Sequence, residues 1–259
     1  LLKEKRQAVI SHAVTKGLNA NAPMRDSGVE WLGEVPEHWV LSQFRYLMSG
    51  GTRNGLYKPE GDKTPDGCPF IQMGEAFADR VFNQETKDRV NVKSNELETW
   101  GVKASDLLFA RRSLVLEGSG KCTRIGDIKE PHLFESSMIR VRPRKEKVIS
   151  VFLHYLLDSA VMRAHLLSTT KTVTISGIDS SQLKALNMAM PPMQEQEEII
   201  TYLDSYLKHI DRISRQTQRS IELSKERRTA LISAAVTGKI DVRNWQAPQL
   251  SNNASEALS

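Results

Sequence analysis

A chain of 259 residues can hold one large domain or two small ones, and its formal net charge is +5 at neutral pH. Its two cysteines, Cys68 and Cys122, belong to no Cys-x-x-Cys or Cys/His cluster, which argues against a disulfide framework or a structural zinc site and favours a reducing compartment. The sequence has no run of about 18 apolar residues and no signal-peptide pattern, so we expect a soluble, cytoplasmic protein without a membrane segment.

The first 17 residues predict a helix whose sequence returns near the end of the chain. Residues 4–15 align with residues 226–237 at a shift of 222 positions. The shared residues in the first copy are Glu4, Arg6, Ala8, Ile10, Ser11, Ala13, Val14 and Thr15. Solenoid repeats recur at roughly 20 to 50 residues, so this spacing indicates the end of one module followed by a complete module. The first residue is Leu rather than Met, and together with the truncated repeat this leads us to expect a fragment or an incompletely represented protein.

Residues 17–23 read as a polar linker, and a segment with two tryptophans, Asp26 to Trp39, reads as a packed loop. From Leu41 to about Pro143, short apolar bursts alternate with turn signals, which is typical of β-strands. The predicted strands are residues 68–73, 89–92, 106–111, 122–125 and 137–142.

Helical periodicity begins after this strand-rich region. Residues 148–167 predict one amphipathic helix, followed by a Thr-rich loop over residues 168–177. A short helix capped near Asp179 or Ser180 and a last strand near residues 185–190 complete the globular part.

A long helix is predicted from Pro191 to about Lys239. The two prolines at its start stop the preceding segment, and Glu195, Glu197 and Glu198 place negative charge at its N-terminal end. Apolar residues in steps of three and four indicate a coiled-coil seam that needs a partner helix. We expect the helix-pair or partner interface to contain Ile199, Leu203, Tyr206, Ile210, Ile213 and Leu231.

Signatures of catalysis are absent from the sequence. It contains no P-loop, no Gly-x-Gly-x-x-Gly, no Gly-x-Ser-x-Gly and no His-Glu-x-x-His, and its six histidines are scattered. We therefore expect a non-catalytic chain that binds no metal.

Nucleic-acid binding has more support. Residues 105–147 contain ten basic and six acidic residues, a local excess suited to a polyanion, although an ordinary solvated surface produces such an excess as well. Arginine suits guanine and glutamine suits adenine, lysine suits phosphates, and hydroxyl side chains suit contacts to the DNA backbone or to base edges. The candidate DNA-binding residues are Arg53, Lys58, Gln72, Arg111, Arg112, Lys121, Arg124, Lys171, Thr172 and Thr174.

Several motifs in one order carry a resemblance to a known family. They are Trp31-Leu-Gly-x-x-Pro-x-x-Trp39, Phe70-Ile-Gln-Met-Gly-Glu75, Asp106-Leu-Leu-Phe-Ala-Arg-Arg112, Gly177-Ile-x-x-x-x-Leu183, Pro191-Pro-x-x-Glu-Gln-x-x-Ile199 and Arg228-x-Ala-Leu-Ile-Ser-Ala-Ala-Val-Thr-Gly238. Over nearly its whole length the chain resembles the specificity subunit of type I restriction-modification systems, in the C-terminal half.

The resemblance implies an α+β fold: a β-rich target-recognition domain with two long conserved helices that pack as an antiparallel coiled coil. Residues 1–17 then match the end of the central conserved helix and residues 25–190 the second recognition domain. Residues 191–240 match the C-terminal conserved helix, and residues 241–259 form a polar tail.

The resemblance also implies a mechanism. One recognition domain reads half of a split site in double-stranded DNA, and the helices dock modification (methyltransferase) subunits, which a restriction (motor and nuclease) subunit joins. No cofactor is expected on this chain, whereas S-adenosylmethionine, ATP and Mg are expected on the partner subunits. A half-length subunit could also pair as a homodimer.

Two alternatives stay open. The chain could be the specificity-like module of a fused type II methyltransferase, or a coiled-coil assembly protein that binds no DNA in a sequence-dependent way.

Overall fold

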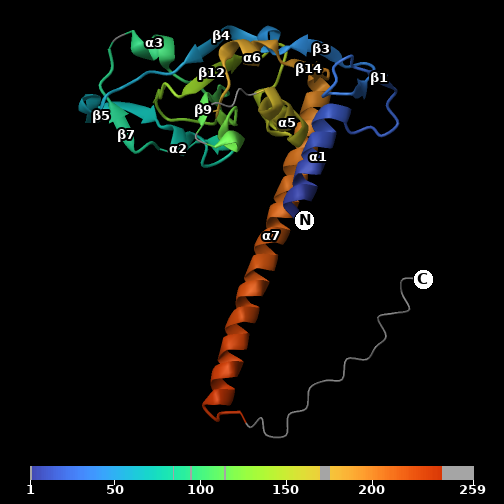
Figure 1. The fold of residues 1–259 in the computed structure, drawn as a ribbon, viewed down its shortest axis with the longest axis vertical. Helices are drawn as coiled ribbons and strands as arrows, with labels where there is room; N and C mark the ends of the chain where they lie inside the picture. Colours follow the sequence, from blue (N-terminus) through green and yellow to red (C-terminus); the bar gives the residue numbers. More distant parts are fainter. Residues whose placement is uncertain (1, 84, 94, 114, 170–175, 241–259) are drawn as a thin grey trace. The chain divides into compact units, whose positions relative to one another are not determined.

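A five-stranded sheet lies at the centre of the globular part (Figure 1). Its strand order is β4-β12-β8-β10-β6, antiparallel except for the parallel pair of β10 and β6. The strands are β4 (Met48–Asn54), β6 (Val81–Phe82), β8 (Leu107–Ala110), β10 (Cys122–Ile125) and β12 (Met138–Pro143). All four residues of β8 are buried, with Leu107 and Phe109 in one core cluster and Leu108 in another, so both faces of the sheet are covered.

A second sheet has the order β11-β5-β7. It consists of β5 (Lys63–Ile71), β7 (Asp88–Val90) and β11 (Leu133–Phe134), with a register shift between Lys63 and Cys68. Short helical segments lie around the two sheets: α2 (Met73–Ala76), α3 (Glu96–Trp100) and the 3-10 turns η1 (Phe44–Leu47), η2 (Glu60–Asp62) and η3 (Leu116–Gly118).

The predicted strands are confirmed, with shifted ends except for residues 122–125, which match β10. Three two-stranded ladders complete the β structure: β1 (Met24–Asp26) with β2 (Glu34–Pro36), β3 (Val40–Gln43) with β14 (Asn187–Met190), and β9 (Arg112–Ser113) with β13 (Ser176–Gly177). The interpretation of residues 26–39 as a loop was therefore partly wrong, because β2 lies within it.

The prediction of one helix over residues 148–167 was also wrong in one respect. Two helices occupy this stretch, α4 (Ser150–Asp158) and α5 (Ala160–Thr169). Ser159 is fully buried in extended conformation between them. Its Oγ donates to Leu156 O at 2.7 Å and accepts from Met162 N at 3.3 Å, so it ends one helix and caps the next.

The short helix α6 (Ser180–Ala185) begins as predicted. Asp179 is its N-cap, and the Asp179 carboxylate accepts from Ser181 N and Gln182 N. The Gln182 side chain in turn accepts from Asp179 N at 2.9 Å, which completes a capping box.

The computed structural model describes residues 2–83, 85–93, 95–113, 115–169 and 176–240. They divide into two units with a boundary between Leu207 and Lys208, which falls inside the 44-residue helix α7 (Met193–Val236).

In the first unit, α1 (Leu2–Lys16) packs with one face against the core. Ile10, Ala13 and Val14 are almost fully buried, and Ser11 Oγ accepts from Ala160 N at 3.0 Å. Figure 1 shows α1 alongside the first turns of α7, and a hollow between them is lined by residues that include Val9 and Tyr202. The resemblance led us to expect two long helices. The described residues contain one long helix, α7, and the 15-residue helix α1.

The first turn of α7 is fixed to the globule by two side chains. Glu195 accepts two hydrogen bonds from Trp39 Nε1, each at 3.1 Å, and pairs with His38 at 2.7 Å. Gln196 is fully buried; its Oε1 accepts from Ile149 N at 2.9 Å. Its Nε2 donates to Pro191 O at 3.0 Å and Lys147 O at 3.3 Å.

In the second unit, the described helical residues 208–236 expose most of their apolar side chains. Ile221, Leu223, Leu231, Ile232 and Val236 are all more than a third exposed. An apolar stripe on a lone helix of this length requires a partner to bury it.

We predict that Gln196→Ala lowers the free energy of unfolding by about 2 kcal/mol, because it leaves backbone groups without partners in the core. Urea denaturation followed by circular dichroism measures this. Gln194→Ala is the matched control, since Gln194 is exposed and bonds only Glu198 of the same helix. Equal stabilities for the two variants would contradict the clamping role of Gln196.

Candidate nucleic-acid interface

The ends of several strands meet at one end of the central sheet, where four of the seven described DNA-binding candidates lie, namely Arg53, Arg111, Arg112 and Lys121. Gly55 N donates to Met138 O at 3.1 Å, and Arg111 N donates to Ser137 O at 2.8 Å. Ala110 N donates to Lys121 O at 2.8 Å. Backbone hydrogen bonds therefore align the end of β4, the start of β12, the end of β8 and the start of β10.

Arg111 and Arg112 leave the sheet at this end. In the β9–β13 ladder Arg112 lies opposite Gly177, and Ile178 N donates to Arg111 O at 3.1 Å. The two arginines thus lie beside the end of the Thr-rich loop. Lys171, Thr172 and Thr174 of that loop lie outside the described residues.

Arg53 lies on β4, which β12 separates from β8, and its side chain is exposed. It lies directly opposite Arg140 of β12, and like charges placed so are unfavourable unless an anion is near. Burial, Arg142 and Arg53 together lower the pKa of Arg140, with Asp106 opposing them. The edge of the sheet around Arg53 is therefore electropositive.

The basic side chains of the globule fall into two classes. Many hold the fold through hydrogen bonds or ion pairs with described residues, and these include Lys63, Arg80, Arg89, Lys121, Arg142 and Arg163. By contrast, the side chains of Arg53, Arg111 and Arg112 make no hydrogen bond or ion pair to any other described residue. These three cations are therefore available to an external anion.

Lys58 belongs to the first class. Its side chain is 6% exposed, and Nζ donates to Glu96 Oε2 and Asn91 O, each at 2.8 Å. Burial would raise the pKa of Glu96, but hydrogen bonds from Lys58 and from the backbone of Lys93 hold it below its ordinary value. The structure places Lys58 in an internal ion pair.

Gln72 and the two basic residues at β10 are also engaged or partly covered. Gln72 Nε2 donates to Asp88 Oδ2 at 2.9 Å, and this bond, assisted by Lys63, lowers the pKa of Asp88. Lys121 is exposed but donates to Phe77 O at 2.9 Å, and Arg124 is half-buried on β10. DNA contacts by these three residues stay a prediction.

The sequence did not predict a hollow at this end of the sheet. It has a volume of about 410 Å³ and is lined by Asn54, Arg111, Asp179, Ser180, Ser181 and Lys184. Of these only Arg111 was predicted as a contact. Asn54 directly follows Arg53 in the sequence, and that adjacency is the signal that could have revealed it.

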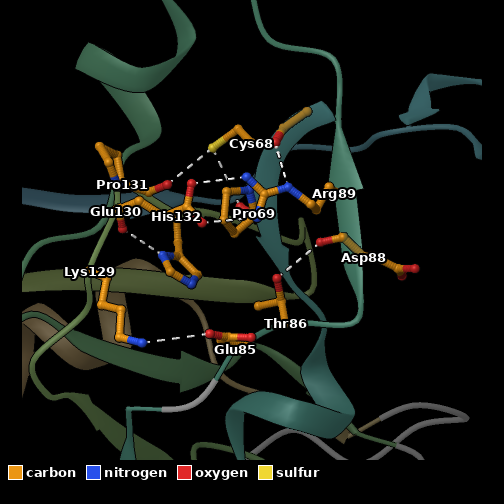
Figure 2. A network of polar contacts seen from close by, with 11 residues as sticks. Cys68, Pro69, Glu85, Thr86, Asp88, Arg89, Lys129, Glu130, Pro131 and His132 are labelled. Carbon is orange, nitrogen blue, oxygen red and sulfur yellow. Dashed lines mark hydrogen bonds and ion pairs between the residues drawn. The ribbon is translucent and has the colours of Figure 1, made fainter. Parts of the chain in front are cut away.

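A separate polar network ties the second sheet to the segment before β11 (Figure 2). Arg89 donates to both carboxylate oxygens of Glu130 at 2.9 Å, and Cys68 Sγ donates to Pro131 O at 3.2 Å. Burial raises the pKa of the Cys68 thiol and lowers that of His132, so the two groups are neutral near pH 7. These contacts suit a structural latch, and among the described residues no group of His, Cys, Asp and Glu is arranged to hold a metal ion.

The apolar residues predicted for a helix interface divide between the two units. Ile199 and Leu203 are fully buried in the main core of the first unit, and Tyr206 packs against it. In the second unit, Ile210 is buried and Ile213 half-buried, whereas Leu231 is 50% exposed. Ile199 and Leu203 thus belong to the core of the first unit.

We predict that Lys58→Ala lowers the free energy of unfolding by about 2 kcal/mol, because it leaves the Glu96 carboxylate without its partner. Thermal denaturation measures this, and Lys87→Ala, at an exposed lysine, is the control. Unchanged stability together with weaker DNA binding would instead identify Lys58 as a DNA contact.

Three kinds of comparison bear on this arrangement. The family profile described as "Type I restriction modification DNA specificity domain" matches residues 53–223. The specificity subunit of the type I restriction enzyme EcoKI from Escherichia coli K12 is 23% identical over 264 residues, covering 100% of this chain and 54% of the relative. That of MjaVIII from Methanocaldococcus jannaschii is 21% identical, covering 94% of this chain and 55% of the relative.

Solved structures share the fold. A type I restriction-modification structure, described in terms of complex assembly and conformational transition, matches with a TM-score of 0.64 at 17% identity, covering 90% of this chain and 53% of that one. The HsdS subunit from Thermoanaerobacter tengcongensis matches with a TM-score of 0.58 at 16% identity, covering 83% of this chain and 45% of that one.

The chain spans about half the length of the curated relatives it matches. The family profile, however, extends from β4 through the sheets and into α7, which is well over half of this chain. The chain therefore belongs to the family of type I restriction-modification DNA specificity domains.

Proposed function

We propose that this chain is the DNA-reading part of a type I specificity subunit and recognises one half of a split site in double-stranded DNA. The observation that carries the proposal is the convergence of Arg53, Arg111 and Arg112, all unengaged by described residues, at one end of a rigid sheet. Loops beside a rigid scaffold are the usual place for binding residues, and arginine forks suit base edges and phosphates.

We further propose that the chain corresponds to the C-terminal half of such a subunit. The internal repeat supports this, because α1 shares eight of the twelve aligned residues with the end of α7 and its neighbour Thr237, as the end of a central conserved helix would. On this proposal, residues 25–190 are the second target-recognition domain and residues 191–240 the C-terminal conserved helix.

The two copies of the repeat differ in burial, which supports a helix-mediated assembly. In α1, Ile10 and Val14 are fully buried against the globule that follows. Their counterparts near the end of α7, Ile232 and Val236, are 54% and 82% exposed. The end of α7 therefore resembles the buried helix α1 in sequence, but its corresponding apolar side chains are exposed.

We propose that an antiparallel coiled coil of two long helices buries these side chains, either within a longer chain or between two copies of this chain. The same helices would dock modification (methyltransferase) subunits, with a restriction subunit joining them. The chemistry would belong to these partners, which would carry S-adenosylmethionine, ATP and Mg, and this chain would bind no cofactor. Among the described residues no helix is long and apolar enough to cross a membrane.

The test of the function is a methylation map of DNA from cells that carry this chain with its cognate modification subunit. We expect N6-methyladenine in a split motif. A palindromic motif would indicate paired half-length subunits, and an asymmetric one a two-domain reader. An active partner that methylates no defined motif would overturn the proposal and favour a coiled-coil assembly protein.

The helix proposal makes a separate prediction. Ile221→Asp combined with Leu231→Asp should abolish assembly with the modification subunit or a second copy, because charges replace exposed apolar residues of α7. Light scattering after size-exclusion chromatography measures the assembly, and Gln218→Asp is the control on the same helix. Since both altered residues are exposed, the globule should stay folded, and persistence of the assembly would show that the seam lies elsewhere.

A further inference from the structure

The hollow between β4 and α6 contains a pair of side chains whose chemistry matches two different purine bases. Asn54 is exposed at the end of β4, and Arg111 follows the end of β8. Both line the hollow together with Lys184 of α6. None of the three side chains makes a hydrogen bond or ion pair to another described residue.

Backbone contacts fix the positions of Asn54 and Arg111. Asn54 lies opposite Ile139 in the β4–β12 ladder, and Gly55 N donates to Met138 O at 3.1 Å. A Cβ atom at Gly55 would lie 2.1 Å from the carbonyl oxygen of Glu135, so only glycine allows the strand to pass this turn. The backbone N–H of Arg111 donates to Ser137 O at 2.8 Å, and its carbonyl oxygen accepts from Ile178 N at 3.1 Å.

Their side chains offer complementary hydrogen-bonding groups. A carboxamide presents one acceptor and two donors in a plane, which matches N6 and N7 of adenine, whereas a guanidinium fork matches O6 and N7 of guanine. Lysine provides a single mobile charge, which suits a phosphate. Other surface side chains, such as that of Lys145, also make no hydrogen bond or ion pair to another described residue. The side chains of Asn54, Arg111 and Lys184 differ in that they line one hollow.

Resting on the DNA-reading function proposed above, we propose that this hollow is a purine-reading subsite for the major-groove edge of duplex DNA. Asn54 reads an adenine, Arg111 reads a guanine in the same half-site, and Lys184 holds a phosphate of the backbone beside them. The carboxylate of Asp179 lies in the same lining, but it is occupied in capping α6. It also repels a phosphate from its own side of the hollow.

The experiment uses the full chain in complex with its modification subunits. Selection from a random duplex library defines the preferred half-site of the unaltered complex, and the same selection is repeated with Asn54→Ala, Arg111→Lys and Lys184→Ala. Asn21→Ala and Lys145→Ala, at exposed residues of the linker and a turn, are the matched controls. Thermal denaturation of each variant establishes that it is folded.

We expect Asn54→Ala to lose the preference for adenine at one position and to weaken binding to the selected site about 10- to 100-fold. Arg111→Lys keeps the charge but loses the fork, so it should lose the preference for guanine at another position. Lys184→Ala should weaken binding equally on all sequences and reduce the salt dependence by about one phosphate contact.

Two results would overturn the inference while leaving the DNA-reading function intact. One is an unchanged selected motif in the Asn54 and Arg111 variants, and the other is equal weakening of these variants on every sequence. If the unaltered complex selects no motif at all, the proposed function itself fails and the subsite fails with it.

Discussion

The packing of the first unit depends on the buried carboxamide of Gln196. This one side chain bonds the backbone before α4, the backbone before α7 and the start of α4 itself, while the neighbouring Glu195 bonds Trp39. A buried amide with all its partners in place specifies a single geometry, because any displacement leaves polar groups unsatisfied. The first turn of α7 is therefore held against the globule by hydrogen bonds, and the apolar contacts of Ile199 and Leu203 add stability.

Hydrogen-bond partners also separate the charges that hold the fold from those proposed to contact DNA. Asp106 is almost fully buried and receives both Nε and Nη2 of Arg142 at 2.8 Å, which holds the residues before β8 against the sheet. Arg53 and Arg111, by contrast, end at the sheet surface without such partners in the described residues. The cations that hold the fold and those proposed to contact DNA are thus different residues, and the net charge of the sequence does not distinguish them.

Elements defined by local physical rules were predictable from the sequence. Strand β10 and the capping box at Asp179 follow from short-range patterns, and the start of α7 follows from its prolines and acidic residues. The break at Ser159 was missed because its hydroxyl substitutes for backbone bonds in a way that apolar periodicity does not reveal. The pairing of Lys58 with Glu96 was missed because it joins residues 38 positions apart.

The narrow clearance at Gly55 has a consequence for how such a domain changes its target. The main chain there is fixed by packing against the Glu135 carbonyl, while the neighbouring Asn54 side chain extends into an open hollow. Replacing that side chain alters the hydrogen-bonding groups that line the hollow without removing a contact from the core. If Asn54 reads DNA as proposed, evolution can vary the recognised sequence at little thermodynamic cost to folding, because the scaffold residue and the reading residue are neighbours in the chain but contribute separately to stability.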